Sequence, residues 1–254
     1  MDQQLYRQFY DIEERYWWSV GTRRLFFELV APLVDDPAAR VLDVGCGTGI
    51  TLREFPRRCR LLCGCDLSPT ALAFSRQRGL DCLVRSDVTA LPFASGSADL
   101  VLALDVIEHV DADEQALREI ARVCRPGGHV LVHVPAFPVL WTVKDELNHH
   151  RRRYRRAALR ALVERAGLRV AALAYFNCTA FPAALAVALV QAARRRLAAP
   201  RPAAPAAVER LYALPPLLNR SLTALLAAER RAVPHLPFGM SLVCLARKPV
   251  GVYG

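Results

Sequence analysis

Three glycines at alternate positions follow an acidic residue in the segment Val41-Leu42-Asp43-Val44-Gly45-Cys46-Gly47-Thr48-Gly49. The segment reads as a buried strand, a glycine turn and the start of a helix. Glycine tolerates positive φ and lets a ligand approach the backbone closely. The dinucleotide-binding pattern G-x-G-x-x-G would need glycine at position 50, which is Ile50. The carboxylate of Asp43 would repel a pyrophosphate and would suit an ammonium group, so the turn favours a different cofactor.

Three further acids follow strand-like runs. Asp66 comes after the second run, at the distance from Gly45 that is typical of a ribose-binding acid. Asp87 follows the third run, where it could accept an adenine amino group. Asp105 follows the fourth and opens Asp105-Val106-Ile107-Glu108-His109. Each acid alone fits a cap or a turn. Because open α/β sheets bind ligands at the carboxyl ends of their strands, the set predicts a binding site.

Apolar runs that alternate with helical patterns must position these residues. The expected strands are 41–44, 61–65, 82–84, 100–104, 129–134, 168–175 and 241–246, and the expected helices are 51–58, 69–78, 112–124 and 156–166. Short strands separated by helices predict right-handed crossovers and a doubly wound α/β sheet. Arg125-Pro126-Gly127-Gly128 predicts the end of a helix and a turn.

The motifs together resemble the class I S-adenosylmethionine (SAM)-dependent methyltransferases of the ubiquinone-biosynthesis-like type, over roughly residues 40 to 135. The matching motifs are Val41–Gly49, Gly64-Cys65-Asp66-Leu67-Ser68, Ser86-Asp87-Val88 with Leu91-Pro92-Phe93, Asp99–His109, and Arg125-Pro126-Gly127-Gly128. The resemblance implies a Rossmann-like, seven-stranded sheet whose last strand is antiparallel. It also implies SAM as the cofactor, with Asp66 on the ribose and Asp87 on the adenine. The set of expected cofactor-binding residues is completed by Asp43, Gly45, Gly47, Gly49, Leu67, Val88 and Asp105.

A narrower resemblance, to an uncharacterised bacterial subgroup of these enzymes, covers the flanks. Its motifs are Glu14-Arg15-Tyr16-Trp17-Trp18 with Gly21 and Arg23-Arg24, then Asp145, His150, Arg152, Arg153 and Tyr154, and finally Tyr175-Phe176-Asn177, Asn219 and Pro237–Ser241. This subgroup has no settled substrate, so the resemblance does not name the acceptor.

The domain organisation follows from two regions outside the strand–helix alternation. Residues 1–40 form an aromatic-rich helical extension, expected as a lid, and residues 178–239 form a helical insertion, expected to cover the acceptor pocket. The SAM-binding core is then 41–177 with 240–250. As a lid, Trp17 would flank the sulfonium by cation–π contact, and Arg23 would meet the methionine carboxylate. The alternative is that the tryptophans are core aromatics of the extension.

Methyl transfer needs an aligned acceptor, and it needs a general base when the acceptor is a hydroxyl. We expect His150 and Tyr154 to take or orient a proton, because they follow the fifth strand. Arg152 and Arg153 could hold an anionic group of the acceptor. His109 and Asn177 complete the expected acceptor site, whereas His133, His149 and Glu108 are weaker candidates. The competing hypothesis is that this segment caps the next helix or pairs with acids of the fold.

Charge and cysteine content bear on partners and location. The formal net charge is +10, and eight arginines lie between Arg151 and Arg169. Such a concentration suits an anionic small molecule, a lipid headgroup or nucleic acid, although it also fits a solvated helix face. Eight scattered cysteines without a CxxC pair predict neither a disulfide framework nor a metal site, and they favour the cytoplasm.

The predicted function is transfer of a methyl group from SAM to a small-molecule acceptor, by O- or N-methylation. The sequence disfavours a nucleic-acid methyltransferase. Enzymes that methylate the amino group of adenine usually carry a Pro-Pro-Tyr-like motif after the fourth strand, whereas the acids Asp105 and Glu108 occupy that place here. The uncharged stretch 170–193 leaves open an enzyme at a membrane surface that methylates a lipid or isoprenoid. A SAM-binding protein without methylation activity is the remaining alternative.

Overall fold

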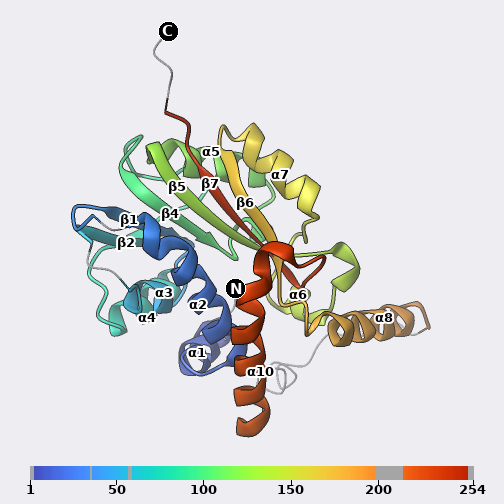
Figure 1. Cartoon of the computed structure of the whole chain (residues 1–254). Coiled ribbons are helices and arrows are strands. Elements are labelled where there is room, and N and C mark those ends of the chain that lie inside the picture. Colours follow the sequence, from blue (N-terminus) through green and yellow to red (C-terminus); the bar gives the residue numbers. More distant parts are fainter. Residues whose placement is uncertain (1–2, 35, 57–58, 198–213, 251–254) are drawn as a thin grey trace.

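A single mixed sheet forms the centre of the molecule (Figure 1). The computed structural model describes residues 3–34, 36–56, 59–197 and 214–250. The strand order is β3 (Leu83–Arg85), β2 (Leu61–Asp66), β1 (Arg40–Val44), β4 (Ala98–Leu104), β5 (Cys124–Pro135), β7 (Ser241–Arg247) and β6 (Arg169–Phe176). Only β7 runs antiparallel to its neighbours, β5 and β6. The predicted seven-stranded Rossmann-like sheet with an antiparallel last strand is confirmed.

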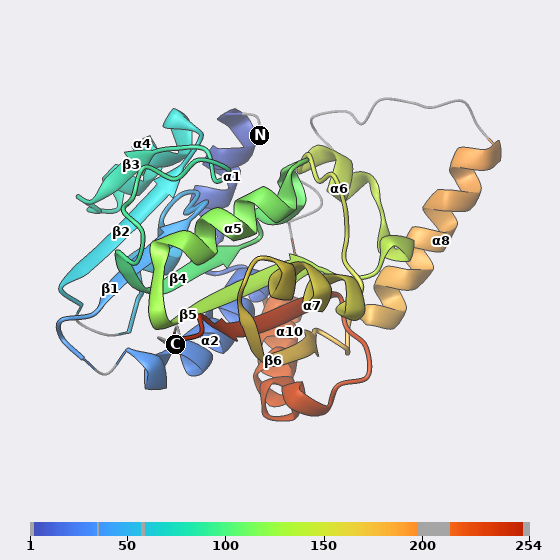
Figure 2. The same ribbon diagram turned by 90° about the horizontal axis from the view of Figure 1, so that it is seen from above.

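Helices cover both faces of the sheet (Figure 2). One face carries α5 (Asp113–Val123) and α7 (Arg156–Arg165), and the other carries α2 (Trp17–Val30), α10 (Pro216–Glu229) and η4 (Arg230–His235). The remaining elements are α1 (Gln3–Ile12), η1 (Ala31–Leu33), α3 (Ile50–Arg53), α4 (Pro69–Gln77), η2 (Ile107–His109), η3 (Pro138–Leu140), α6 (Val143–Leu147) and α8 (Phe181–Leu197). Among the described helices, none combines the length and the apolarity needed to cross a bilayer.

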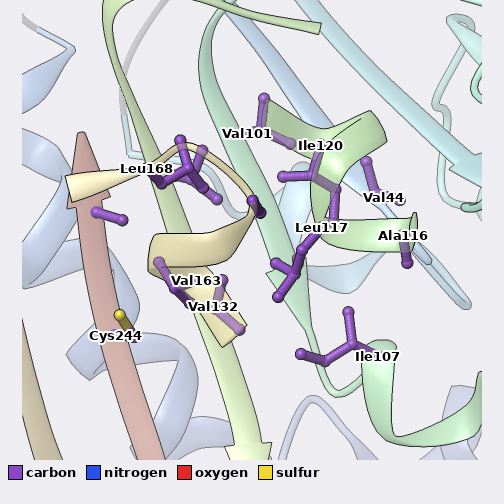
Figure 3. Close-up of a cluster of buried hydrophobic side chains, with 14 of the residues drawn as sticks. Val44, Val101, Ile107, Ala116, Leu117, Ile120, Val132, Val163, Leu168 and Cys244 are labelled. Carbon is purple, nitrogen blue, oxygen red and sulfur yellow. The ribbon is translucent and has the colours of Figure 1, made fainter. Parts of the chain in front are cut away.

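Strand β4 shows why the sheet has two cores. Side chains alternate between the faces of a strand, and here both faces are buried. Val101 and Ala103 pack with Leu117 of α5, in the cluster drawn in Figure 3, whereas Leu100 and Leu102 pack toward α2. Each of these side chains is at most 1% exposed. The near-continuous apolar runs in the sequence therefore correspond to strands covered on both sides.

Two element boundaries differ from the predicted ones. The helix before Arg125 ends at Val123 as expected, but β5 already begins at Cys124. The extra residues are accommodated by a shift of register against β4, between Ala98 and Leu100. Helix α3 ends at Arg53, well before the predicted residue 58. Residues 57–58 of that predicted helix lie outside the described ranges.

In the described part of the insertion before the last strand, helices α8 and α10 lie apart (Figures 1 and 2). Helix α10 packs along α2, where a Cβ atom on Gly21 would fall 2.5 Å from Cδ1 of Leu226. Helix α8 packs on the loop after β5, where Gln191 Oε1 accepts a hydrogen bond from Val143 N at 3.0 Å. The predicted Pro/Ala-rich break at 198–207 lies outside the described residues.

Candidate active site

The glycine turn after β1 has the geometry that its sequence requires. Gly45, Gly47 and Gly49 have φ values of +72°, +55° and +82°, which L side chains rarely adopt. A Cβ atom would meet Val106 at Gly45 and Leu80 at Gly49, at 2.5 Å in each case. At Gly47 a Cβ atom would have nothing within 4 Å. The turn is therefore packed tightly by the protein on two sides and is open at its middle glycine.

Asp66 at the end of β2 is oriented by backbone donors. Its Oδ2 accepts from Gly47 N at 3.0 Å, and its Oδ1 accepts from Ser68 N at 2.8 Å. Burial raises the pKa of this carboxyl, and the backbone N–H donors oppose the rise. Its remaining lone pairs can accept from the two hydroxyls of a ribose.

Asp43 and Asp87 complete the acids at this end of the site. The side chain of Asp43 is buried, and burial together with the nearby charge of Asp66 raises its pKa to about 8. Asp87 Oδ1 accepts from the backbone N and the hydroxyl of Thr89 at 2.8 and 2.7 Å. These bonds leave Oδ2 of Asp87 available to a ligand.

A cavity of about 850 Å³ connects these acids to the loop after β5. Its floor is formed by the carboxyl ends of the strands, and α1 and α2 form its roof. Most of the predicted site residues line it: Asp43, Gly45, Gly47, Asp66, Leu67, Asp87, Val88, Asp105, Trp17, Arg23, His109, His150 and Arg153. The volume lies in the range of small-molecule sites, which is roughly 300–1,000 Å³. The four other predicted residues, Gly49, Arg152, Tyr154 and Asn177, do not line it.

Asp105 projects into the cavity from a strained backbone. Its φ of +53° is unusual for a residue other than glycine, and such strain is concentrated at functional sites. Its Oδ1 lies 2.8 Å from Nδ1 of His133, a fully buried residue of β5. Desolvation in the cavity raises the pKa of Asp105, whose side chain is still about half exposed, but the contact with His133 outweighs this and lowers the pKa. The rings of Trp18 and Phe26 from α2 pack on the His133 imidazole.

Asp145 organises the other end of the cavity. Its Oδ1 lies 2.9 Å from Nδ1 of His150, and Arg153 donates to both its oxygens at 2.7 and 3.0 Å. Burial of this carboxyl would raise its pKa, but the bonds from His150 and Arg153 lower it well below its ordinary value. The ring of His150 lies 4.8 Å from that of His109, whose pKa is lowered to about 4 by burial and by the His150 charge. Two imidazoles thus stand together in the cavity wall.

Tyr154 and Arg152 lie outside this wall, which counts against the acceptor roles predicted for them. The backbone of Tyr154 continues the sheet beside Pro135 and Phe137, and this turns its ring toward α5. Its hydroxyl donates to Asp113 Oδ2 at 2.9 Å, and Arg152 donates to the same oxygen at 3.0 Å. Burial raises the pKa of Tyr154 far above its ordinary value. The geometry favours the competing hypothesis, in which this segment pairs with acids of the fold.

Asn177 also lies outside the cavity lining. It has a φ of +61°, and its Oδ1 accepts from Ala180 N at 3.3 Å, just before α8 begins. Its backbone carbonyl accepts from Met240 N at 3.2 Å. Asn177 therefore joins the two ends of the insertion. Its expected contact with the acceptor has no support in this geometry.

The roof contains Trp17 and Arg23, whose contacts with SAM stay a prediction, together with residues that the sequence did not single out. Arg23 is held by Glu54 at 2.6 Å and by two backbone carbonyls. Trp17 N donates to Asn219 Oδ1 of α10 at 2.9 Å, so two motifs distant in the sequence meet here. Glu13 and Lys144 also line the cavity. Glu13 directly precedes the motif that begins at Glu14, and Lys144 directly precedes Asp145. Their place beside these motifs is the sequence feature that could have indicated them.

None of the described residues between 178 and 239 lines the cavity. Helix α10 supports α2 from behind, and α8 supports the loop that carries α6. The insertion therefore reaches the site through these neighbours. Direct cover of the acceptor pocket by 178–239 stays a prediction.

The fold is a Rossmann-like domain, and its cavity holds a row of acids at the carboxyl ends of the strands. Comparison with known proteins makes the assignment specific: residues 42–132 match the family model of the methyltransferase domain. This matched region is a methyltransferase domain similar to those of the class I SAM-dependent enzymes, whose cofactor is SAM.

Two relatives and one solved structure illustrate the similarity. The chain is 34% identical over 119 residues to mouse tRNA (carboxymethyluridine(34)-5-O)-methyltransferase ALKBH8, covering 46% of the chain and 17% of that protein. It is 34% identical over 132 residues to demethylmenaquinone methyltransferase of Corynebacterium kroppenstedtii, covering 51% and 54%. The fold resembles a chain from the complex between the Haloferax volcanii Trm112 methyltransferase activator and a candidate methyltransferase. That match has a TM-score of 0.63 and 21% identity, and it covers 99% and 97% of the two chains.

The matches to curated relatives span only part of those proteins. The matched region covers from 17% to 63% of the first four, so their activities are not carried over to this chain as a whole.

Proposed function

We propose that this chain transfers the methyl group of SAM to a small-molecule acceptor bound beside His109 and His150. The observation that carries the proposal is the continuous cavity between the acids of the sheet edge and the histidine-lined wall. Its volume of about 850 Å³ is enough for a cofactor and a compact acceptor, but α1 and α2 leave little space for a large one.

The residues at the sheet edge are suited to hold SAM. Asp66 would accept from the ribose hydroxyls, Asp87 from the adenine amino group, and Asp43 would face the ammonium group of the methionine moiety. Leu67 and Val88 supply apolar contact on either side of the adenine. When bound, SAM supplies an electrophilic methyl group, so the protein has to align the acceptor and exclude water.

At the acceptor end His150 is the proposed proton acceptor. Asp145 engages its Nδ1 at 2.9 Å, which leaves Nε2 for the acceptor. Arg153 neutralises Asp145 and positions it. Residues 1–40 act as the lid in this proposal, because α1 and α2 form the cavity roof.

The proposal is tested by product formation. Purified protein is incubated with SAM and panels of phenols, carboxylates and amines, and S-adenosylhomocysteine is quantified by mass spectrometry. Asp66→Ala serves as the inactive control. We expect one compound class to give turnover that His150→Ala reduces. SAM binding without turnover of any acceptor would favour a SAM-binding protein that does not methylate.

A tRNA acceptor is the second candidate, because the net charge is +10 and one relative is named a tRNA methyltransferase. The arginines between 151 and 169 support it weakly, since five of the eight pair with acids of the fold: Arg151 with Asp111, Arg152 with Asp113, Arg153 with Asp145, Arg160 with Glu164 and Arg165 with Glu114. Binding of labelled tRNA at rising salt tests this candidate, and a steep loss of affinity together with methylation would favour it.

The proposal includes a cytoplasmic location, which suits eight cysteines without a CxxC pair. Contact with a membrane surface is the alternative. Val187, Leu189 and Val190 on α8 are each more than half exposed, and Arg194 and Arg195 follow them. Co-sedimentation with anionic vesicles distinguishes the two, since a cytoplasmic enzyme stays in the supernatant.

A further inference from the structure

Glu108, His109 and His150 form a cluster that methyl transfer alone does not explain. Their ligand-type atoms, one carboxylate oxygen and two imidazole nitrogens, all lie within 4.8 Å of one another. Glu108 and His109 are adjacent in η2, whereas His150 comes from the loop after α6. The sequence predicted no metal site here, because the fold brings together residues 41 positions apart.

The carboxylate of Glu108 is the unusual member of the cluster. Its side chain is fully buried, and neither carboxylate oxygen has a hydrogen-bond partner among the described residues. Buried polar atoms are almost always paired, and an unpaired one costs about 1–3 kcal/mol, or more if it is charged. A partner that is not part of the chain would remove this cost.

His150 is arranged as metal-binding histidines usually are. In such sites the second ring nitrogen bonds to a carboxylate or a backbone carbonyl, and this fixes the ring orientation. His150 Nδ1 lies 2.9 Å from Asp145 Oδ1, and Asp145 is itself fixed by Arg153 and by Thr142 N at 2.8 Å. Both histidines line the cavity, which supplies a path of entry.

We propose that Glu108, His109 and His150 bind one divalent transition-metal ion, such as Zn²⁺ or Mn²⁺. Two imidazoles and one carboxylate, without a thiolate, suit these ions. Metal–ligand bonds of about 2.1 Å place ligand atoms no more than about 4.2 Å apart, so the side chains close slightly around the ion. Asp145 acts as a positioning residue for His150.

A metal ion at this site would also restrict the chemical class of the acceptor. Three protein ligands leave coordination positions for other groups, and His109 and His150 face the cavity. An acceptor with a hydroxyl or carboxylate oxygen could occupy such a position, and coordination lowers the pKa of a bound hydroxyl. With the ion bound, His150 is a ligand and no longer a free base, so coordination of the acceptor oxygen takes the place of proton transfer to His150 Nε2. This step rests on the proposed function, whereas binding of the ion does not.

The test is metal binding by tag-free, full-length protein in the absence of SAM and acceptor. After dialysis against chelator, Zn²⁺ and Mn²⁺ are titrated by calorimetry, and bound Mn²⁺ is followed by electron paramagnetic resonance. We expect one ion per chain, and at least tenfold weaker binding in Glu108→Gln, His109→Asn and His150→Asn. Asp145→Asn should weaken binding by about 10–100-fold through the orientation of His150.

His235→Ala is the matched control, because that exposed histidine lies in η4, outside the cluster. Thermal melting identifies any variant that does not fold. The ligand variants that do fold then test whether these three side chains bind the ion. Wild-type protein that binds neither ion at one equivalent, or ligand variants that bind like His235→Ala, would overturn the proposal. Methyltransferase failure with intact ion binding would leave the metal site standing and would refute only the proposed function.

Discussion

Glu13, one residue beyond α1, forms an ion pair with Arg78, whose side chain is fully buried behind the glycine turn. The same carboxylate accepts from the hydroxyl of Thr48 in the turn, and Arg78 donates to the Thr48 carbonyl at 3.1 Å. The guanidinium also donates to Tyr10 O at 2.9 Å. One buried ion pair thus joins the roof of the cavity to the loop on its floor.

Removing Glu13 should therefore loosen the roof. Glu13→Ala leaves the Arg78 charge buried without its main partner, which costs about 3 kcal/mol or more. We expect a lower free energy of unfolding in urea and faster dissociation of SAM in stopped-flow fluorescence of Trp17 and Trp18. Asp11→Ala is the control, because this exposed acid lies in the last turn of α1 and takes no part in the contacts of Arg78 given above. Equal behaviour of the two variants would contradict a fastening role for Glu13.

Asp66 supplies the sharpest test of cofactor binding. Its oxygens already accept from Gly47 N and Ser68 N, so they are fixed for a ribose. We expect Asp66→Ala to weaken SAM binding at least tenfold in calorimetry, which corresponds to about 1.4 kcal/mol. Asp81→Ala, at an exposed acid before β3, should bind normally. An unchanged affinity in Asp66→Ala, or equal binding of NADH, would refute the cofactor site as described.

Asp43 should make the stability of the ligand-free protein depend on pH. Burial and Asp66 raise its folded-state pKa to about 8, whereas an unfolded aspartate has a pKa near 3.9. Between these values the folded state keeps a proton that the unfolded state has lost. The contribution to stability is therefore complete below about pH 4 and is lost as the pH rises toward about 8.

Asn cannot ionise, so Asp43→Asn should remove that pH dependence. We expect the melting temperature of Asp43→Asn, relative to that of wild type, to increase from pH 5 to pH 8. Asp81→Asn should show the same pH dependence as wild type. Parallel profiles for wild type and Asp43→Asn would show that Asp43 ionises normally in the fold.

The sequence was most informative where local pattern and tertiary structure demand the same residue. The predicted strand 100–104 lies inside β4, because a strand buried on both faces must be continuously apolar. The glycines at 45 and 49 were identifiable because positive φ and close packing both require them. The apolar run and the glycine spacing are therefore visible in the sequence, although the packing partners Val106 and Leu80 are not.

Side-chain direction in the loop after β5 could not be predicted in the same way. Tyr154 and Arg153 are neighbours in the sequence, yet one turns toward Asp113 and the other toward Asp145 at the cavity. Their directions depend on how the segment pairs beside β5, which no local pattern encodes. For the same reason the orphaned carboxylate of Glu108 became visible only in the structure.

The contact between α2 and α10 provides the last prediction. Gly21 has no side chain where Leu226 packs, and a Cβ atom there would lie 2.5 Å from Leu226 Cδ1 and 3.1 Å from Cβ. Gly21→Val should overpack this contact and cost about 1–3 kcal/mol. Leu226→Ala removes a side chain that is 1% exposed and should cost about 2–5 kcal/mol.

Because the two side chains compete for one space, their effects should not add. In a double-mutant cycle measured by urea unfolding, we expect Gly21→Val/Leu226→Ala to be more stable than the sum of the single variants by about 1 kcal/mol or more. Since α2 carries Trp17 and Arg23, Gly21→Val should also weaken SAM binding, and the second substitution should restore part of it. Phe27→Leu, a change in the same helix at a ring that packs on Phe55, should be additive with Leu226→Ala. Additive energies for Gly21→Val would mean that α10 does not brace the roof through this contact.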